Sequence, residues 1–251
     1  MLKEKWEFGV LGVYDYNERG TLDGYFDFVK KNVDKIDGDI VEAGVFNGKS
    51  LLGMGLLLKE IGSDKKVYGF DSFSGFPAEH KNDDLDRYSD LYAIGKIDRE
   101  HLNKVLKNKF WRESLLNLPV NVNNISKSAN FSNVNRTIIE KKIELLNLDN
   151  IVLIEGNFLE TMIDGNGPTK IMAGLIDCDL YSSYQISLPY IWKKLVVGGY
   201  LYLDEYYSLK FPGARMAADE FFDTKADKPQ METLVIRDFQ RWFVLKSKTW
   251  L

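Results

Sequence analysis

The feature that most constrains the fold is a repeated pattern in which a short apolar segment is followed by a turn and then by a helical pattern. Five such segments, each ending at an acidic residue or a glycine, lie at 39–44, 66–71, 151–156, 172–177 and 200–204. This alternation is typical of βαβ units, which form a parallel sheet. We therefore expect an α/β fold in which the carboxyl ends of these strands line one crevice, the usual ligand site of such sheets.

The domain organisation follows from length and from the breaks in this pattern. The chain has 251 residues and no linker rich in Pro, Gly or Ser, which predicts a single domain over residues 1–251. Residues 1–37 precede the first strand and predict an N-terminal helical cover, with an amphipathic helix over 22–32. Residues 77–130 interrupt the alternation, and we expect them to form a helical lid or acceptor-binding wall; a surface excursion without a catalytic role is the alternative.

Composition excludes several classes of function. The chain has 33 Lys and Arg against 37 Asp and Glu, a formal net charge of −4, which argues against binding to nucleic acid or to an anionic membrane. One cysteine excludes an internal disulfide and fits a reducing compartment, and two histidines exclude a multi-histidine metal site. With no long apolar run and no signal-peptide core, we expect a soluble cytoplasmic protein whose polar chemistry depends on carboxylates.

The turn after the first strand predicts a cofactor site. Glu42, Gly44 and Gly48 form the pattern ExGxxxG between a strand and a helix, where glycines let the backbone approach a ligand. Asp71 ends the second strand, where a carboxylate can accept hydrogen bonds from both ribose hydroxyls. The third glycine of the dinucleotide motif is missing, so the pattern favours a smaller nucleoside-containing cofactor. A structural turn with a capping aspartate is the alternative, and Phe158 after the third strand could stack on a purine or belong to the core.

Carboxylates follow two strands that should be neighbours in the sheet. Asp177, Asp204 and Glu205 could provide oxygen ligands to a hard divalent cation. Asp179 would then be free to act as general base on a hydroxyl held near the metal. The alternative is that one or two of these acids cap the helices they precede. Cys178 lies between two of the acids and is better explained as buried packing than as a nucleophile.

Four segments, in this order, resemble the macrocin O-methyltransferase family of S-adenosylmethionine (SAM)-dependent enzymes, which includes methyltransferases of deoxysugars in macrolide and aminocoumarin antibiotics. They read DIVEAGVFNGKS, VYGFDSFSGFP, IEGNFLET and LIDCDLYSSYQISLPYIWKKLVVGGYLYLDEYYSLKFPGARMAADEFF. The resemblance covers about residues 38–76 and 135–222. It implies the class I (Rossmann-like) methyltransferase fold, a mostly parallel seven-stranded sheet with helices on both faces and an antiparallel last strand. Residues 241–246 would fit the final hairpin.

The resemblance also implies roles for individual residues. It places Glu42, Gly44 and Ser50 near the methionine part of SAM and Asp71 on the ribose. Ser72 and Phe73 would lie beside the adenosine, and Asn157 and Phe158 at the adenine. Asp177 would contact both the cofactor and Mg²⁺ or another divalent cation, Asp204 and Glu205 would also bind the metal, and Asp179 would be the catalytic base. The family usually has aspartate where this chain has Glu205, so the metal geometry is expected to differ.

The function implied is SAM- and Mg²⁺-dependent transfer of a methyl group to a hydroxyl of a sugar or a sugar-containing natural product. Two alternatives stay open, namely a catechol-type O-methyltransferase acting on a small aromatic diol and a non-catalytic SAM-binding domain. The aromatic N-terminal segment, with Trp6, Phe8, Tyr14 and Tyr16, could pack on the domain, at the active site or against another subunit of a homo-oligomer.

Overall fold

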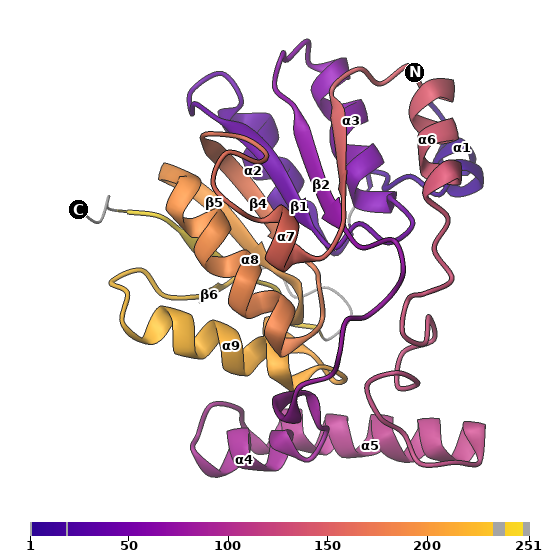
Figure 1. Ribbon diagram of the computed structural model, residues 1–251, viewed down its shortest axis with the longest axis vertical. Helices are drawn as coiled ribbons and strands as arrows, with labels where there is room; N and C mark the ends of the chain where they lie inside the picture. The colour runs from indigo at the N-terminus through magenta and orange to yellow at the C-terminus, as the bar shows by residue number, and fades with distance from the viewer. Residues whose placement is uncertain (1, 19, 233–238, 248–251) are drawn as a thin grey trace.

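The computed structural model describes residues 2–18, 20–232 and 239–247, which are built around one seven-stranded sheet (Figure 1). The strands are β1 (Asp39–Ala43), β2 (Val67–Asp71), β3 (Ile151–Glu155), β4 (Ile171–Ile176), β5 (Leu195–Leu203), β6 (Gln230–Met231) and β7 (Trp242–Leu245). Their order is β3-β2-β1-β4-β5-β7-β6. The first five strands pair in parallel, whereas β7 is antiparallel to both of its neighbours. The predicted α/β fold and the final hairpin are confirmed.

One predicted boundary is wrong. The sequence pattern places the fifth strand at 200–204, after the Gly-Gly pair at 198–199, but β5 already begins at Leu195. Leu195 pairs with Ile171 of β4, and the register then shifts so that Tyr200 pairs with Ala173. The glycine segment is therefore an irregularity inside the strand, which is a common role for glycine in sheets.

Helices cover both faces of the sheet, because the side chains of each strand alternate between the faces. In β1, Val41 packs with one apolar cluster and Ile40 with the other. The first face carries α7 (Phe158–Thr161), α8 (Tyr181–Lys194) and α9 (Pro212–Asp223). The second face carries α2 (Asp23–Asn32) and α3 (Lys49–Glu60), and α1 (Lys5–Leu11) packs against α3. The helix α6 (Arg136–Leu145) precedes β3.

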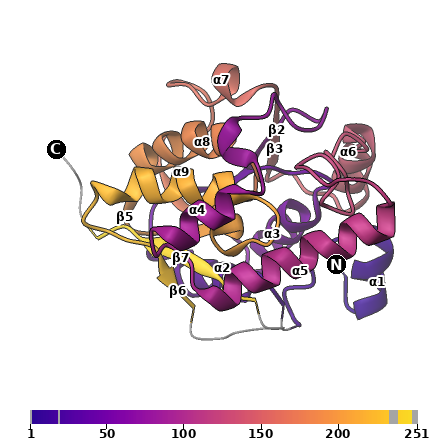
Figure 2. The same ribbon diagram turned by 90° about the horizontal axis from the view of Figure 1, so that it is seen from below.

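The 77–130 segment has a small apolar core of its own. It contains the 3-10 helix η1 (Lys81–Asp83) and the helices α4 (Arg87–Ala93) and α5 (Arg99–Leu116). Tyr88, Leu91 and Val105 pack together with Leu180 and Phe211 of the main domain. Figures 1 and 2 show α4 and α5 crossing the end of the molecule toward which the parallel strands point. The segment therefore lies beside the carboxyl edge of the sheet, where ligand sites of such folds are found.

Most of the N-terminal aromatic side chains pack on the domain. Phe8 is buried against α3, and Tyr14 stacks on Phe26 of α2 with ring centroids 4.8 Å apart. Tyr16 packs edge-on against Phe8, while Trp6 remains 62% exposed. None of the helices in the described part of the chain is long and apolar enough to cross a membrane.

Candidate active site

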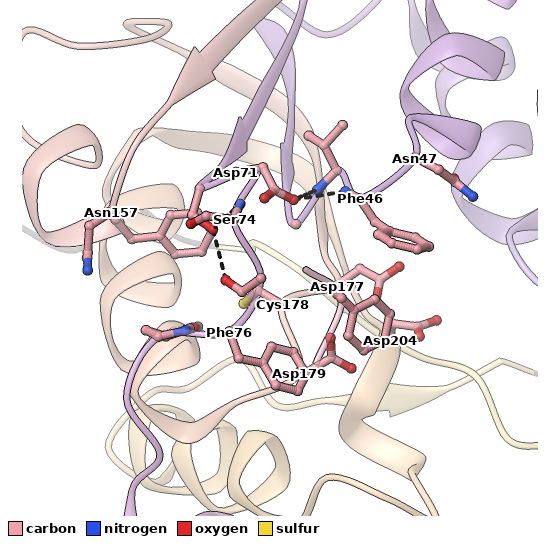
Figure 3. A pocket seen from close by; sticks show the side chains of 18 of the residues that line it. Phe46, Asn47, Asp71, Ser74, Phe76, Asn157, Asp177, Cys178, Asp179 and Asp204 are labelled. Atoms are coloured by element: carbon pink, nitrogen blue, oxygen red, sulfur yellow. Dashed lines mark hydrogen bonds between the residues drawn. The ribbon is translucent and has the colours of Figure 1, made fainter. Parts of the chain in front are cut away.

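A cavity of about 900 Å³ opens at the carboxyl ends of β1, β2, β4 and β5 (Figure 3). A cavity of this size is large enough for a nucleoside cofactor together with a small acceptor. The predicted site residues that line it are Gly44, Ser50, Asp71, Ser72, Asn157, Phe158, Asp177, Asp179 and Asp204. Glu42, Phe73 and Glu205 are not among the lining residues of the described chain.

Gly44 allows the two central strands to approach each other closely. Its φ is +91°, and a Cβ atom built there would lie 1.8 Å from the carbonyl oxygen of Asp177. The backbone N–H of Asp177 in turn donates to the carbonyl oxygen of Ala43 at 2.9 Å. The glycine turn after β1 therefore lies directly beside the acidic turn after β4, and the cavity reaches both.

Asp71 fixes the glycine turn from the neighbouring strand. Its Oδ2 accepts hydrogen bonds from the backbone N–H groups of Val45 at 2.7 Å and Phe46 at 2.8 Å (Figure 3). Its Oδ1 accepts a hydrogen bond from the N–H of Phe73 at 2.7 Å. Each carboxylate oxygen has further lone pairs, so Asp71 can also accept hydrogen bonds from ligand hydroxyls at the cavity wall.

Glu42 lies beneath the cavity, in the middle of the sheet. Its side chain is fully buried, and its Oε1 accepts a hydrogen bond from the Ser50 hydroxyl at 2.7 Å. Within the part of the chain that the structure describes, its Oε2 is buried without a hydrogen-bond partner. Burial raises the pKa of Glu42 to about 8, although the Ser50 hydrogen bond opposes this. Burial therefore favours the protonated form of Glu42, and its hydrogen bond to Ser50 connects it to the cavity lining.

The remaining predicted cofactor residues separate into two groups. Asn157 caps α7, with its Oδ1 accepting from the N–H of Leu159 at 2.9 Å, and it lines the cavity beside Phe158. Phe73 instead packs with the apolar cluster on the α2–α3 face, and Arg136 lies over its ring. The adjacent Ser72 does reach the cavity. The assignment of Phe73 to the adenosine stays a prediction.

The acidic side chains gather on one side of the cavity. One carboxylate oxygen from each of Asp177, Asp179 and Glu205 lies within 4.8 Å of the others. Asp204, the first residue of η2 (Asp204–Tyr207), lines the cavity next to them (Figure 3). Glu205 is buried and lies 3.4 Å from the hydroxyl of Tyr184.

None of these acids is used to cap the helix that follows it. The residues preceding α8 and η2, Leu180 and Leu203, provide no side-chain cap, and the first N–H of α8 is bound by Asp83. The capping alternative is therefore not realised. Cys178 is buried near Ser187, and burial raises the pKa of its thiol, which disfavours a nucleophilic thiolate.

The electrostatics of the acidic group fit a cation. Burial raises the pKa of Asp177 and Glu205 well above the usual range, and the charge of Asp204 raises both further. Burial also raises the pKa of Asp179 to about 7, against the opposing effect of Lys210. Such carboxylates repel one another unless protons or a positive ion neutralise them. Their oxygens are the donors that Mg²⁺ prefers, so the residues present fit a hard divalent cation.

An aromatic wall is the main part of the site that sequence reasoning missed. Phe131 packs edge-on against Phe46 and tilted against Phe76, with ring centroids 5.0 and 5.1 Å away. All three side chains line the cavity. The available signal was the series of aromatic residues flanking the 77–130 segment, which borders the cavity through Pro77 and Ala78.

The fold and the site together define an α/β protein with a large cavity at the carboxyl edge of its sheet, bordered by a group of acidic side chains. A family model of macrocin-O-methyltransferase (TylF) matches residues 25–149 and 113–236. The chain therefore belongs to the macrocin-O-methyltransferase family, which is a family of enzymes.

Individual proteins similar to this chain are also named as O-methyltransferases. The chain is 28% identical over 189 residues to demethyldecarbamoylnovobiocin O-methyltransferase of Streptomyces niveus, an alignment that covers 74% of this chain and 58% of that relative. It thus spans little more than half the length of this relative. Among solved structures, the O-methyltransferase NovP is similar with a TM-score of 0.63 and 20% identity, over 90% of this chain and 79% of the other.

Two further structures share the fold. Calicheamicin methyltransferase CalS11 matches with a TM-score of 0.58 and 17% identity, over 96% of this chain and 80% of the other. An O-methyltransferase from Bacillus cereus, solved in complex with SAH, matches with a TM-score of 0.50 and 12% identity, over 96% and 88% of the two chains.

Proposed function

We propose that this protein is a SAM-dependent O-methyltransferase that methylates a hydroxyl of a sugar or a small sugar-containing natural product with the help of a divalent cation such as Mg²⁺. The observation that carries the proposal is that a single cavity joins the turn fixed by Asp71 to the acidic group around Asp177. Family membership supports methyl transfer as the reaction. The bound SAH of the Bacillus cereus enzyme supports the cofactor.

The chemistry of the site is consistent with this reaction. When bound, SAM supplies a methyl group on a positively charged sulfur, and a divalent cation makes a nearby hydroxyl more acidic. Asp177, Asp204 and Glu205 would hold the cation. Asp179 would accept the hydroxyl proton as general base. Phe46 and Phe131 would exclude water from the acceptor.

Two relatives support a sugar-containing acceptor. The Streptomyces niveus protein is named for its action on demethyldecarbamoylnovobiocin, and CalS11 is described as a TDP-rhamnose 3'-O-methyltransferase. A cavity of about 900 Å³ leaves room for such an acceptor beside the cofactor.

The aromatic wall supports a second candidate, a catechol-type O-methyltransferase. Phe46, Phe76 and Phe131 would contact a flat aromatic diol as readily as they would contact the apolar face of a sugar. The two candidates share the cofactor and the cation and differ only in the acceptor.

The deciding experiment combines binding and turnover. We expect the protein to bind SAH in isothermal titration, and to methylate nucleotide sugars or glycosides in preference to catechols when Mg²⁺ is present. Asp179→Asn should lower kcat by about 100-fold or more while SAH binding is kept. Asp223→Asn, at an exposed end of α9, is the matched control.

Each part of the proposal has its own contrary result. Full turnover in excess chelator would exclude the cation, and preferential turnover of catechols would favour the second candidate. SAH binding without turnover of any acceptor would indicate a non-catalytic SAM-binding domain, and absence of SAH binding would contradict the whole proposal.

A further inference from the structure

The turn that carries Asp179 is strained. Asp179 has a φ of +60°, and the N–H of Leu180 donates to the carbonyl oxygen of Cys178 at 2.6 Å. Asp179 is thus the central residue of a three-residue turn of the rare, strained kind. A residue with a side chain is held in this conformation only when its surroundings fix the backbone on both sides. On the N-terminal side, Asp177 is fixed by pairing with Ala43 of β1.

On the C-terminal side, the turn is fixed from a distant part of the chain. The helix α8 begins at Tyr181, and its own N-cap residue provides no side-chain acceptor. The Oδ1 of Asp83, which is 98 residues earlier in the sequence, accepts the hydrogen bond from the N–H of Tyr181 at 2.8 Å. Its Oδ2 accepts from the N–H of His80 at 2.9 Å. One carboxylate therefore joins the 77–130 segment to the start of α8.

The surroundings of Asp83 leave its carboxylate little freedom. The residue is 1% exposed, and a Cβ atom added to Gly213 at the start of α9 would lie 2.1 Å from its Oδ1. The same added atom would lie 3.0 Å from the backbone nitrogen of Tyr181. The ring of His80 stacks on the ring of Tyr181, with centroids 4.5 Å apart and planes inclined by 15°. The contact between Asp83 and the start of α8 is thus tightly packed by Gly213 and by the stacked rings of His80 and Tyr181.

We propose that Asp83 is a positioning residue for methyl transfer: by capping α8 from the 77–130 segment, it holds the 177–180 turn and so keeps the carboxylate of Asp179 at the acidic side of the cavity. Asp83 itself does not line the cavity, so it acts through Asp179. The inference rests on the proposed role of Asp179 as base. It gives the 77–130 segment a part in aligning the catalytic group, in addition to bordering the cavity.

The test compares Asp83→Ala and Asp83→Asn with Asp98→Ala in the full-length protein. Asp98 is the matched control, because it lies in the same segment and caps α5 through the N–H of His101 at 2.7 Å, away from the 177–180 turn. We expect Asp83→Ala to lower kcat by about 10- to 100-fold, with the KM for acceptor and the SAH affinity changed by less than about threefold. Asp83→Asn keeps one acceptor oxygen and should recover much of kcat. Asp98→Ala should lower only thermal stability.

Hydrogen exchange over residues 177–184 tests the junction independently of turnover. We expect faster exchange there in Asp83→Ala than in the wild type or in Asp98→Ala, because the N–H of Tyr181 loses its acceptor. Unchanged exchange or unchanged kcat in Asp83→Ala would overturn the inference, as would an equal fall of kcat in Asp98→Ala. If the wild type methylates no acceptor, the proposed function fails, while the exchange data still decide whether Asp83 holds the turn.

Discussion

Asp71 at the end of β2 accepts a hydrogen bond from the backbone N–H of Phe46 at 2.8 Å, across 25 residues of sequence. The same carboxylate oxygen accepts from Val45, and the other accepts from Phe73. Asp71 therefore fixes the turn after β1, and under the proposed function it would also bind the ribose of the cofactor.

The first prediction is that Asp71→Ala loses both cofactor affinity and stability. Hydrogen bonds to a charged acceptor contribute about 1.5–3 kcal/mol each, so the free energy of unfolding should fall by roughly 2 kcal/mol or more, and SAH affinity by at least about tenfold. Asp71→Asn keeps one acceptor oxygen and should show intermediate losses. Isothermal titration and urea unfolding measure the two effects.

Asp37→Asn is a suitable control, since Asp37 is an exposed acid paired with Lys170. It should leave SAH affinity unchanged. If Asp71→Ala bound SAH as tightly as this control does, Asp71 could neither contact the cofactor nor organise its loop.

A second prediction concerns the pH dependence of stability through Glu42. In the unfolded chain this carboxyl loses its proton near pH 4.5, whereas burial raises its pKa in the folded protein to about 8. Its contribution to stability is therefore complete below about pH 4.5 and is lost as pH rises toward 8. Glu42→Gln resembles the protonated acid and does not titrate. We expect the free energy of unfolding of the variant to equal that of the wild type at pH 5 and to exceed it at pH 9 by on the order of a few kcal/mol.

Urea unfolding at pH 5, 7 and 9 without ligand measures this difference. Glu144→Gln on the exposed face of α6 serves as the control and should follow the wild type at each pH. Parallel pH profiles for Glu42→Gln and the wild type would show that Glu42 is ionised in the folded protein.

A third prediction separates cation ligands from the base. The compact group contains Asp177, Asp179 and Glu205, while Asp204 lies at the cavity wall beside it. Under the proposed function, Asp204→Asn should weaken Mn²⁺ binding by about tenfold or more, because it removes a ligand charge. Asp179→Asn should keep Mn²⁺ affinity within about threefold and lose turnover instead. Mn²⁺ titration followed by electron paramagnetic resonance distinguishes the two.

The reversed result would be equally informative. If Asp179→Asn lost Mn²⁺ binding and Asp204→Asn kept it, Asp179 would be a ligand, and the base would have to be another group at the cavity.

The sheet and its acidic edge could be predicted from sequence because both depend on local patterns. Short apolar segments specify strands, and parallel connection places their carboxyl ends together. The sequence therefore predicts that Asp71, Asp177 and Asp204 lie at one edge, and in the structure all three line one cavity. The start of the fifth strand differs from the prediction because a glycine pair such as that at 198–199 has the same sequence signature before a strand and within an irregular strand.

Contacts between distant segments could not be predicted in this way. Asp83 lies in a polar stretch and resembles any surface acid, yet it is buried because α8 and α9 close around it. The ring of Phe73 packs with the apolar cluster on the α2–α3 face, and its φ of +48° is a backbone conformation that the local sequence does not signal. Such orientations depend on tertiary packing, which a single sequence does not encode locally.

The last prediction uses two glycines with similar backbone conformations and different surroundings. Gly44 has a φ of +91° and Gly62 a φ of +67°, so alanine is strained at either position by roughly 1–2 kcal/mol. A Cβ atom at Gly62 would meet no atom of the described residues within 4 Å, whereas at Gly44 it would lie 1.8 Å from the backbone oxygen of Asp177. Asp177 directly follows β4 and its N–H is bound to Ala43, so its carbonyl oxygen cannot move without disturbing the end of that strand. We therefore expect the free energy of unfolding of Gly62→Ala to fall only by this conformational cost, and SAH binding to be kept.

In urea unfolding, the free energy of unfolding should fall by at least about 2 kcal/mol more in Gly44→Ala than in Gly62→Ala, because overpacking against fixed backbone adds to the strain. The variant should also lose SAH and Mn²⁺ binding together, since the added methyl group separates the glycine turn from the acidic turn. Equal stability losses for Gly44→Ala and Gly62→Ala would contradict the close contact between β1 and β4. Separate loss of SAH binding with intact Mn²⁺ binding would show that the two halves of the cavity are held independently.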